Sequence, residues 1–202
     1  MSIYQLKPAF QYLLRPIVKQ LYHWGVSANQ VTLSACIVSV VLGLGLFIID
    51  PEPIAYAVIP AWMLLRMGLN AIDGMLAREY DQKSHLGAFL NELTDVVSDA
   101  ALYLPFVLVL PSHPFWLGLV IVLAGLSEFA GALGESIGAS RRYDGPMGKS
   151  DRAFVFGVLG LSVAFGWTFQ WMFWLMPFIA ILIVITIVRR VNCALNELQT
   201  TR

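Results

Sequence analysis

The sequence NAIDGMLAR at residues 70–78, followed after eight residues by GAFLNELTDVVSD at residues 87–99, decides how this chain is interpreted. Both segments place polar residues three or four positions apart, which is helical spacing, inside sequence apolar enough for a membrane. Acidic side chains in a membrane helix are costly, and they usually face an internal cavity that holds a functional partner. The two segments therefore predict a pair of helices whose polar faces meet.

Five side chains form these two predicted polar faces. Asn70 and Asp73 lie three positions apart on the first helix, and Asn91, Asp95 and Asp99 follow one another at intervals of four on the second. Carboxylate and amide oxygens are the ligands that hard divalent cations such as Mg²⁺ prefer. Facing one another, the two stripes predict an oxygen-rich pocket suited to such an ion.

The composition of the whole chain points to an all-α integral membrane protein. Of its 202 residues, 58% are hydrophobic, and the mean hydropathy is +0.71. These values are too apolar for a soluble domain. A spanning helix needs about 20 mostly apolar residues, and six segments approximately meet this requirement: 30–49, 54–77, 86–109, 114–138, 152–170 and 171–191.

The first 25 residues have a different pattern. Apolar side chains recur there at helical spacing with lysine and arginine between them, which predicts an amphipathic helix lying on the membrane surface. A packed surface helix is the alternative. We therefore expect two parts, a juxtamembrane helix over residues 1–25 and a six-helix membrane domain over residues 26–202.

The distribution of basic residues predicts the orientation. If six helices alternate across the bilayer, every lysine and arginine except Arg66 falls on one side, which the positive-inside rule assigns to the cytoplasm. Both termini and the polar pocket should then face the cytoplasm, in the inner membrane of a bacterial-type cell. The formal net charge is zero, and we expect membrane lipids but no nucleic acid among the partners.

The spacing of the central motif resembles the signature of the CDP-alcohol phosphatidyltransferases, D-x-x-D-G-x-x-A-R, eight residues, then G-x-x-x-D-x-x-x-D. Six of the fixed residues stand in register, namely Asp73, Gly74, Ala77, Arg78, Gly87 and Asp95. The first and third aspartates of the signature are replaced by Asn70 and Asn91. Both departures fall on positions that ligate metal in the family.

This resemblance implies transfer of a phosphatidyl group from CDP-diacylglycerol, or a similar CDP-linked donor, to an alcohol acceptor with release of CMP. It implies Mg²⁺ or Mn²⁺ as cofactor and a homodimeric assembly. The metal ligands would be Asp73, Asp95, Asn70 and Asn91. Asp95 would also be the catalytic base, and Asp99, one turn deeper, could compensate for the missing carboxylates.

The resemblance also implies binding residues for both substrates. Those for the donor nucleotide would be Gly74, Ala77, Arg78, Gly87, Asn29 and Thr32. Basic residues before the fifth span would bind the acceptor, namely Arg142, Lys149 and Arg152. For each set a structural role remains open: close helix packing for the glycines, helix capping near residue 29, and positive-inside anchoring for the basic residues.

Two further expectations concern function and packing. Loss of two carboxylates leaves open a catalytically impaired relative that binds nucleotide or lipid for a partner protein, and an ion path along the acidic stripe is a third possibility. Arg66 lies inside the second span and needs a partner there. We expect this partner to be Glu128, or failing that Glu135, in the fourth span.

Overall fold

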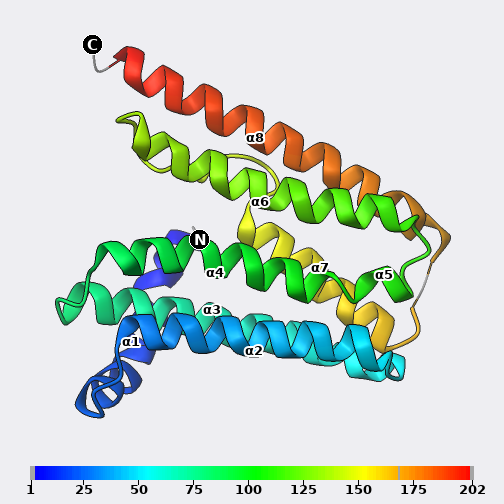
Figure 1. The fold of residues 1–202 in the computed structure, drawn as a ribbon, viewed down its shortest axis with the longest axis horizontal. Coiled ribbons are helices and arrows are strands. Elements are labelled where there is room, and N and C mark those ends of the chain that lie inside the picture. The colour runs from blue at the N-terminus through cyan, green and yellow to red at the C-terminus, as the bar shows by residue number, and fades with distance from the viewer. Residues whose placement is uncertain (1–2, 168, 201–202) are drawn as a thin grey trace.

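In the computed structural model, which describes residues 3–167 and 169–200, every regular element is a helix (Figure 1), as expected for an all-α protein. The outermost residues of the two expected parts, 1–2 and 201–202, lie outside the described residues. The elements are α1 (Ile3–His23), α2 (Ala28–Ile49), the 3₁₀ helix η1 (Pro53–Ala57), α3 (Val58–Glu79), α4 (His85–Tyr103), α5 (Phe106–Val109), α6 (Pro114–Ser136), α7 (Lys149–Ala164), η2 (Gln170–Trp174) and α8 (Leu175–Thr200).

Four of the six expected spans are long and apolar enough to cross a membrane. Within the described residues these are Ala28–Ile49, Pro53–Glu79, Pro114–Ser136 and Trp171–Thr200. The third expected span is divided, because α4 ends at Tyr103, just before Pro105. α4 is also the more polar, since three of its residues are acidic. The fifth, α7, has 16 residues. Six spans therefore remain a prediction, and these two helices would be the more polar and the shorter members.

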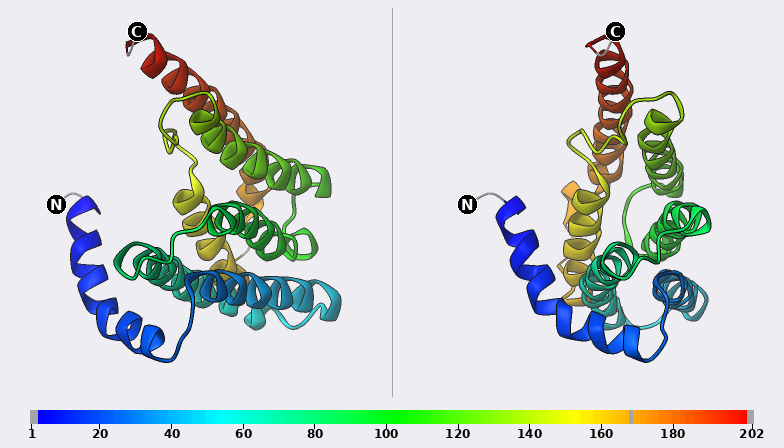
Figure 2. Two further views of the ribbon diagram at one scale, coloured as in Figure 1. Left: turned by 60° about the vertical axis from the view of Figure 1, so that its left-hand side comes forward. Right: turned by 90° about the vertical axis from the view of Figure 1, so that its left-hand side faces the viewer.

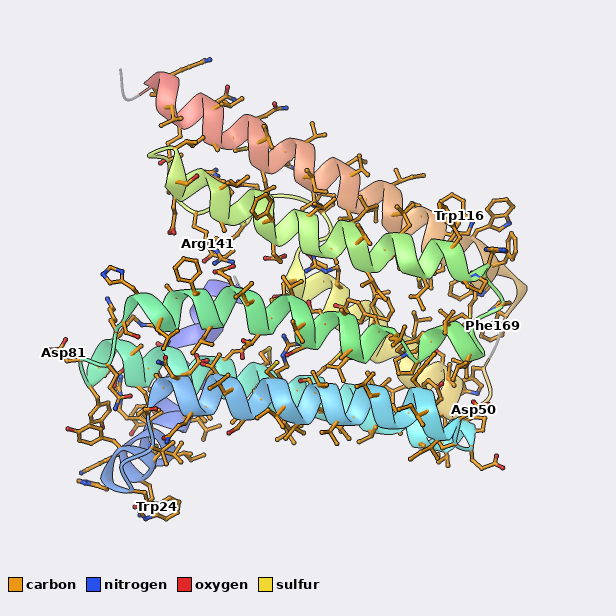
Figure 3. The ribbon with its side chains drawn as sticks, viewed as in Figure 1. Trp24, Asp50, Asp81, Trp116, Arg141 and Phe169 are labelled. Atoms are coloured by element: carbon orange, nitrogen blue, oxygen red, sulfur yellow. The ribbon has the colours of Figure 1, made fainter. Side chains whose placement is uncertain are left out.

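Local sequence sets the ends of the helices that carry the motif. Ser27 caps α2 through a reciprocal pair of hydrogen bonds with Gln30. The Ser84 hydroxyl accepts the backbone N–H of Gly87 at 2.9 Å, which starts α4 directly in front of the second motif half. Asp50, in the left-handed conformation and followed by proline, ends α2 at the opposite end of the bundle from Asp81 (Figure 3).

The helices form two packed groups. α2, α3 and α4 lie side by side, α6 pairs with α8, and α4 also packs on α6, while α7 packs on α3 (Figures 1 and 2). α2 and α4 approach closely at Gly43, where a Cβ atom would overlap the carbonyl of Ala101. This contact sets the spacing between the second half of α2 and the last turns of α4.

α1 is a helix with apolar side chains on two sides. Leu14 and Val18 are buried against Met75 and Leu76 of α3, whereas Ile17 is exposed. The Arg15 guanidinium donates to Glu79 at 2.9 Å, which raises the pKa of Arg15 and ties α1 to the end of α3. α1 covers Ile3–His23, and the amphipathic helix expected over residues 1–25 stays a prediction, as does its position on a membrane surface.

Candidate active site

The site is built where α2, α3 and α4 converge at the end of the bundle that carries Asp81. The backbone N–H of Ala28 donates to the Gln82 side chain at 2.7 Å, which joins the start of α2 to the loop between α3 and α4. This bond brings the first turns of α2 onto the motif. Motif spacing gave no indication of Gln82, since the residue lies among the eight unspecified positions.

Asp73 lies at the α2 side of the site. Its Oδ2 accepts a hydrogen bond from the Thr32 hydroxyl at 2.7 Å, and only 7% of the aspartate is exposed. Thr32, which we expect to bind the donor nucleotide, thus contacts a motif carboxylate, and its role toward the nucleotide stays a prediction. Such a bond fixes the orientation of the Asp73 carboxylate.

Asp95 is surrounded by donors from α3 and α7. Its Oδ1 accepts from Arg66 at 3.0 Å and from the Asn70 amide at 3.4 Å. Its Oδ2 forms an ion pair with the Lys149 ammonium. The two polar stripes therefore do meet, as predicted, and the predicted base and metal ligand is held by two cations.

The prediction for the partner of Arg66 is wrong. The guanidinium contacts Asp99 at 2.5 Å and Asp95, both on α4, and it has no ion pair with Glu128. The acidic stripe of α4 comes within hydrogen-bond distance of Arg66, whereas no ion pair between Arg66 and α6 is found among the described residues. Asp99 is thus the counter-ion of Arg66, and this pairing occupies the carboxylate that we expected to compensate for the missing aspartates.

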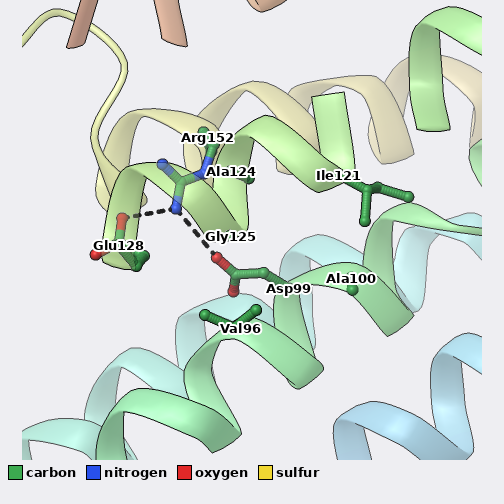
Figure 4. Close-up of a pocket in the computed structure, with 8 residues that line it drawn as sticks. All are labelled: Val96, Asp99, Ala100, Ile121, Ala124, Gly125, Glu128 and Arg152. Atoms are coloured by element: carbon green, nitrogen blue, oxygen red, sulfur yellow. Dashed lines mark hydrogen bonds and ion pairs between the residues drawn. The ribbon is translucent and has the colours of Figure 1, made fainter. Parts of the chain in front are cut away.

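A second polar cluster centres on Glu128 of α6. Its carboxylate is within 4 Å of three arginines, with distances of 2.9 Å to Arg152, 3.4 Å to Arg190 and 3.7 Å to Arg141. Arg152 also reaches Asp99 at 3.6 Å, across a small cavity between α4, α6 and α7 (Figure 4). The predicted acceptor residue Arg152 is therefore buried in an ion network that joins this cluster to the motif.

The two other predicted acceptor residues have different surroundings. Lys149 contacts Asp95, so the structure brings it to the motif. Arg142 donates to Asp144 and Glu197 at 2.8 and 2.7 Å, which lowers the pKa of Asp144 and links the α6–α7 loop to α8. No contact of Arg142 with a motif side chain is present in the part of the chain that the structure describes.

The predicted donor residues gather around the two motif glycines. A Cβ at Gly87 would lie 2.8 Å from the Asn29 side chain, and one at Gly74 would lie 3.0 Å from the guanidinium of Arg78. The space that a Cβ atom would fill at these glycines is therefore occupied by the side chains of Asn29 and Arg78. Asn29 and Arg78 consequently reach the mouth of the site, where Ala77 is half-buried and Arg78 exposed.

The side chains around Asp73 and Asp95 suit one divalent cation better than two. Asp73 and Asp95 provide two carboxylates and Asn70 lies beside Asp95, while Asn91 is expected to add a second amide; all are oxygen donors of the kind that Mg²⁺ and Mn²⁺ accept. Within residues 3–167 and 169–200, no three acidic, histidine or cysteine side chains come together as a possible metal centre. With a single metal ion the donor set fits, since the amides supply oxygens without charge.

Comparisons with known proteins identify the family. A profile of the CDP-alcohol phosphatidyltransferase family matches residues 25–187. The inner membrane protein YnbA of Escherichia coli is 48% identical over 174 residues, which are 86% of this chain and 85% of that protein. The archaetidylinositol phosphate synthase of Aeropyrum pernix is 29% identical over 177 residues, 75% of this chain and 87% of that one.

Solved structures share the fold. The phosphatidylinositol phosphate synthase of Mycobacterium tuberculosis with CDP-DAG bound matches with a TM-score of 0.72 and 23% identity, covering 89% of this chain and 92% of that one. The same enzyme in complex with manganese and citrate matches with a TM-score of 0.71 and 22% identity, covering 89% and 87% of the two chains. From the motif, the meeting of its two polar faces and the match over residues 25–187, we conclude that this chain belongs to the CDP-alcohol phosphatidyltransferase family of phospholipid-synthesis enzymes.

Proposed function

We propose that this protein transfers the phosphatidyl group of CDP-diacylglycerol to an alcohol and releases CMP. The observation that carries the proposal is the meeting of Asn70 of α3 with Asp95 of α4 at 3.4 Å, with Asp73 held by Thr32 and with Asn29 and Arg78 beside the motif glycines. A related synthase binds CDP-DAG, which supports this donor. In the reaction the acceptor oxygen bonds to the lipid-linked phosphorus and the bond from that phosphorus to CMP breaks.

Asp95 takes the acceptor proton in this proposal. Its Oδ2 faces Lys149, whose side chain is 30% exposed, so the ammonium can leave the carboxylate and pair with a substrate phosphate. Arg66 stays on Oδ1, because its side chain is only 7% exposed. Lys149 thus acts at the substrate, and Oδ2 becomes available to the acceptor hydroxyl.

A divalent ion, Mg²⁺ or Mn²⁺, would be held by Asp73, Asp95 and the amide oxygens of Asn70 and Asn91. When bound, it supplies positive charge that stabilises the phosphate oxygens as the bond to CMP breaks. Manganese in the structure of a related synthase supports this assignment. Asp73 is already oriented for the task by Thr32.

The acceptor is proposed to lie by the second polar cluster. Two buried donors there, Nε of Arg141 and Nε of Arg152, have no partner within the described residues. The cavity beside Arg152 is lined by Asp99 and Glu128 and is near the motif. The positive charge of these arginines would attract an acceptor that carries a phosphate, and two relatives are synthases of inositol phosphate lipids.

We place the site at the cytoplasmic face, with α1 on the membrane surface and the chain as a homodimer. Exposed apolar side chains in α1 and just after it, namely Leu13, Ile17 and Trp24, support the surface position. The basic residues at the motif end of the bundle support the orientation.

Release of CMP by the purified protein in nanodiscs tests the proposal. The donor is CDP-diacylglycerol with Mn²⁺ or Mg²⁺, and the acceptors are a panel of free and phosphorylated alcohols, inositol phosphate included. Asp95→Asn should lower the rate by at least about a hundredfold, since general base catalysis contributes that much. Asp81→Asn is the matched control, because Asp81 is an exposed aspartate at the same end of the bundle and asparagine tolerates its positive φ of 59°.

One observation favours a second candidate, a catalytically impaired member that binds nucleotide or lipid. Two motif carboxylates are amides, and Asp95 is paired with two cations. Under this alternative, wild type and Asp95→Asn release CMP equally slowly, while CDP-diacylglycerol still binds. Metal-dependent CMP release that Asp95→Asn abolishes would exclude it.

A further inference from the structure

Arg66 is attached to the motif more firmly than any other cation near Asp95. It lies one turn before Asn70 on α3 and is 6% exposed. Its guanidinium reaches Asp99 Oδ1 at 2.5 Å, Asp95 Oδ1 at 3.0 Å and the Asp95 main-chain carbonyl at 3.2 Å. Arg66 therefore fixes both the carboxylate and the backbone of the proposed base.

The site also carries less negative charge than the family pattern would give it. The pattern has four aspartates, whereas this chain has Asp73 and Asp95 with neutral amides at the other two positions. A fixed guanidinium adds one positive charge at Asp95. Each lost carboxylate removes attraction for a cation, and the guanidinium adds repulsion at a distance where screening is weak.

We propose that Arg66 is a resident cation of the active site, which positions Asp95 and takes over the charge of a second metal ion, so that each chain binds one divalent ion. The role assigned to Asp95 rests on the proposed function, whereas the metal stoichiometry does not. Asn70 and Asn91 belong to the same arrangement, because four carboxylates beside Arg66 would no longer match a single divalent ion.

Metal stoichiometry is measured with Mn²⁺ alone, by electron paramagnetic resonance of the free ion during titration of purified protein in detergent. The expected result is one site per chain in the wild type. Two sites per chain would overturn the proposal. A triple variant, Arg66→Gln with Asn70→Asp and Asn91→Asp, is expected to gain a second site.

Single substitutions at Arg66 separate charge from geometry. Arg66→Gln removes the cation, so Mn²⁺ should bind at least about threefold more tightly. A residue that only held the helices together would leave the affinity unchanged or lower it, and either result contradicts the proposal. Arg15→Gln is the control, since this arginine also loses a carboxylate partner but lies on α1 away from the motif.

Arg66→Lys keeps the charge and loses the fork that reaches both aspartates, which provides a test if Arg66→Gln does not fold. We expect Mn²⁺ affinity to stay within about twofold, because the charge remains. The kcat for CMP release should fall about tenfold or more with little change in KM, because Asp95 is no longer held in place. Unchanged kcat would refute the positioning role.

The two proposals fail in different ways. One Mn²⁺ per chain without CMP release would refute the proposed function and leave the charge assignment of Arg66 intact. CMP release with two Mn²⁺ per chain would support the proposed function and refute the charge assignment of Arg66.

Discussion

Glu128 is the carboxylate whose loss should destabilise this protein most clearly. It is 6% exposed, and three arginines lie within 4 Å of it. Glu128→Gln keeps the size of the side chain and removes its charge. Arg190 then has no other carboxylate within 4 Å among the described residues, so a buried guanidinium is left without a counter-ion.

The expected loss can be worked from these contacts. Removal of one partner from a buried ion pair costs about 3–5 kcal/mol. Arg152 keeps Asp99 at 3.6 Å and Arg141 keeps Glu92, so the lower end, about 3 kcal/mol, applies here. For a chain of this length about 1 kcal/mol lowers Tm by 2–4 °C. The variant should therefore melt about 6–12 °C below the wild type.

The assay is thermal unfolding in detergent, followed by tryptophan fluorescence. Glu135→Gln is the matched control, because Glu135 lies on the same helix and is exposed. A second variant that adds Arg190→Met to Glu128→Gln should recover part of the loss, since it removes the unpaired cation. If Glu128→Gln melts within about 2 °C of Glu135→Gln, the network does not stabilise the bundle and the reasoning is refuted.

Three other predictions follow from single contacts. Thr32→Val should lower kcat/KM by about 10- to 100-fold, because a hydrogen bond to a charged group contributes about 1.5–3 kcal/mol, and Thr32→Ser should retain most activity. Gly43→Ala should lower the free energy of unfolding by about 1–3 kcal/mol, and with it Tm, because the new Cβ overlaps the α4 backbone. Gly45→Ala, whose Cβ meets open space, should leave Tm unchanged. The pKa of Asp144 is lowered by its arginine partner, so this group stabilises the fold above its unfolded pKa, and that contribution is lost as pH falls through the folded value. The Tm difference between wild type and Asp144→Asn should therefore shrink below about pH 4, and a constant difference would contradict the assignment.

Sequence periodicity was sufficient for the helices and for the meeting of the two polar stripes. The spacing placed Asn70 and Asp95 on the polar stripes of their helices, and the two side chains are in contact in the structure. Helix capping near residue 29 was also expected, and Ser27 provides it at the start of α2. These features depend on local sequence, which is why they could be predicted.

The ion pairs could not be predicted in the same way. Arg66 had carboxylates available on α4 and α6, and the choice depends on the rotation and depth of helices that are distant in sequence. The pairing of Lys149 with Asp95 joins residues more than 50 positions apart. From the sequence we expected Lys149 to bind the acceptor. Its pairing with Asp95 could not be predicted, because a lysine near a glycine-rich loop has no unique partner before the fold is known.

The bond between Arg66 and Asp99 has a consequence for how the protein enters its membrane. Arg66 lies in an apolar helix, and its counter-ions follow about 30 residues later on α4. An arginine at the centre of a lone inserted helix costs about 2.5–3.5 kcal/mol, and each aspartate of α4 carries a similar cost. Neither helix is suited to insertion alone. α3 and α4 are therefore expected to enter the bilayer together, as a hairpin whose charges are neutralised before it meets lipid.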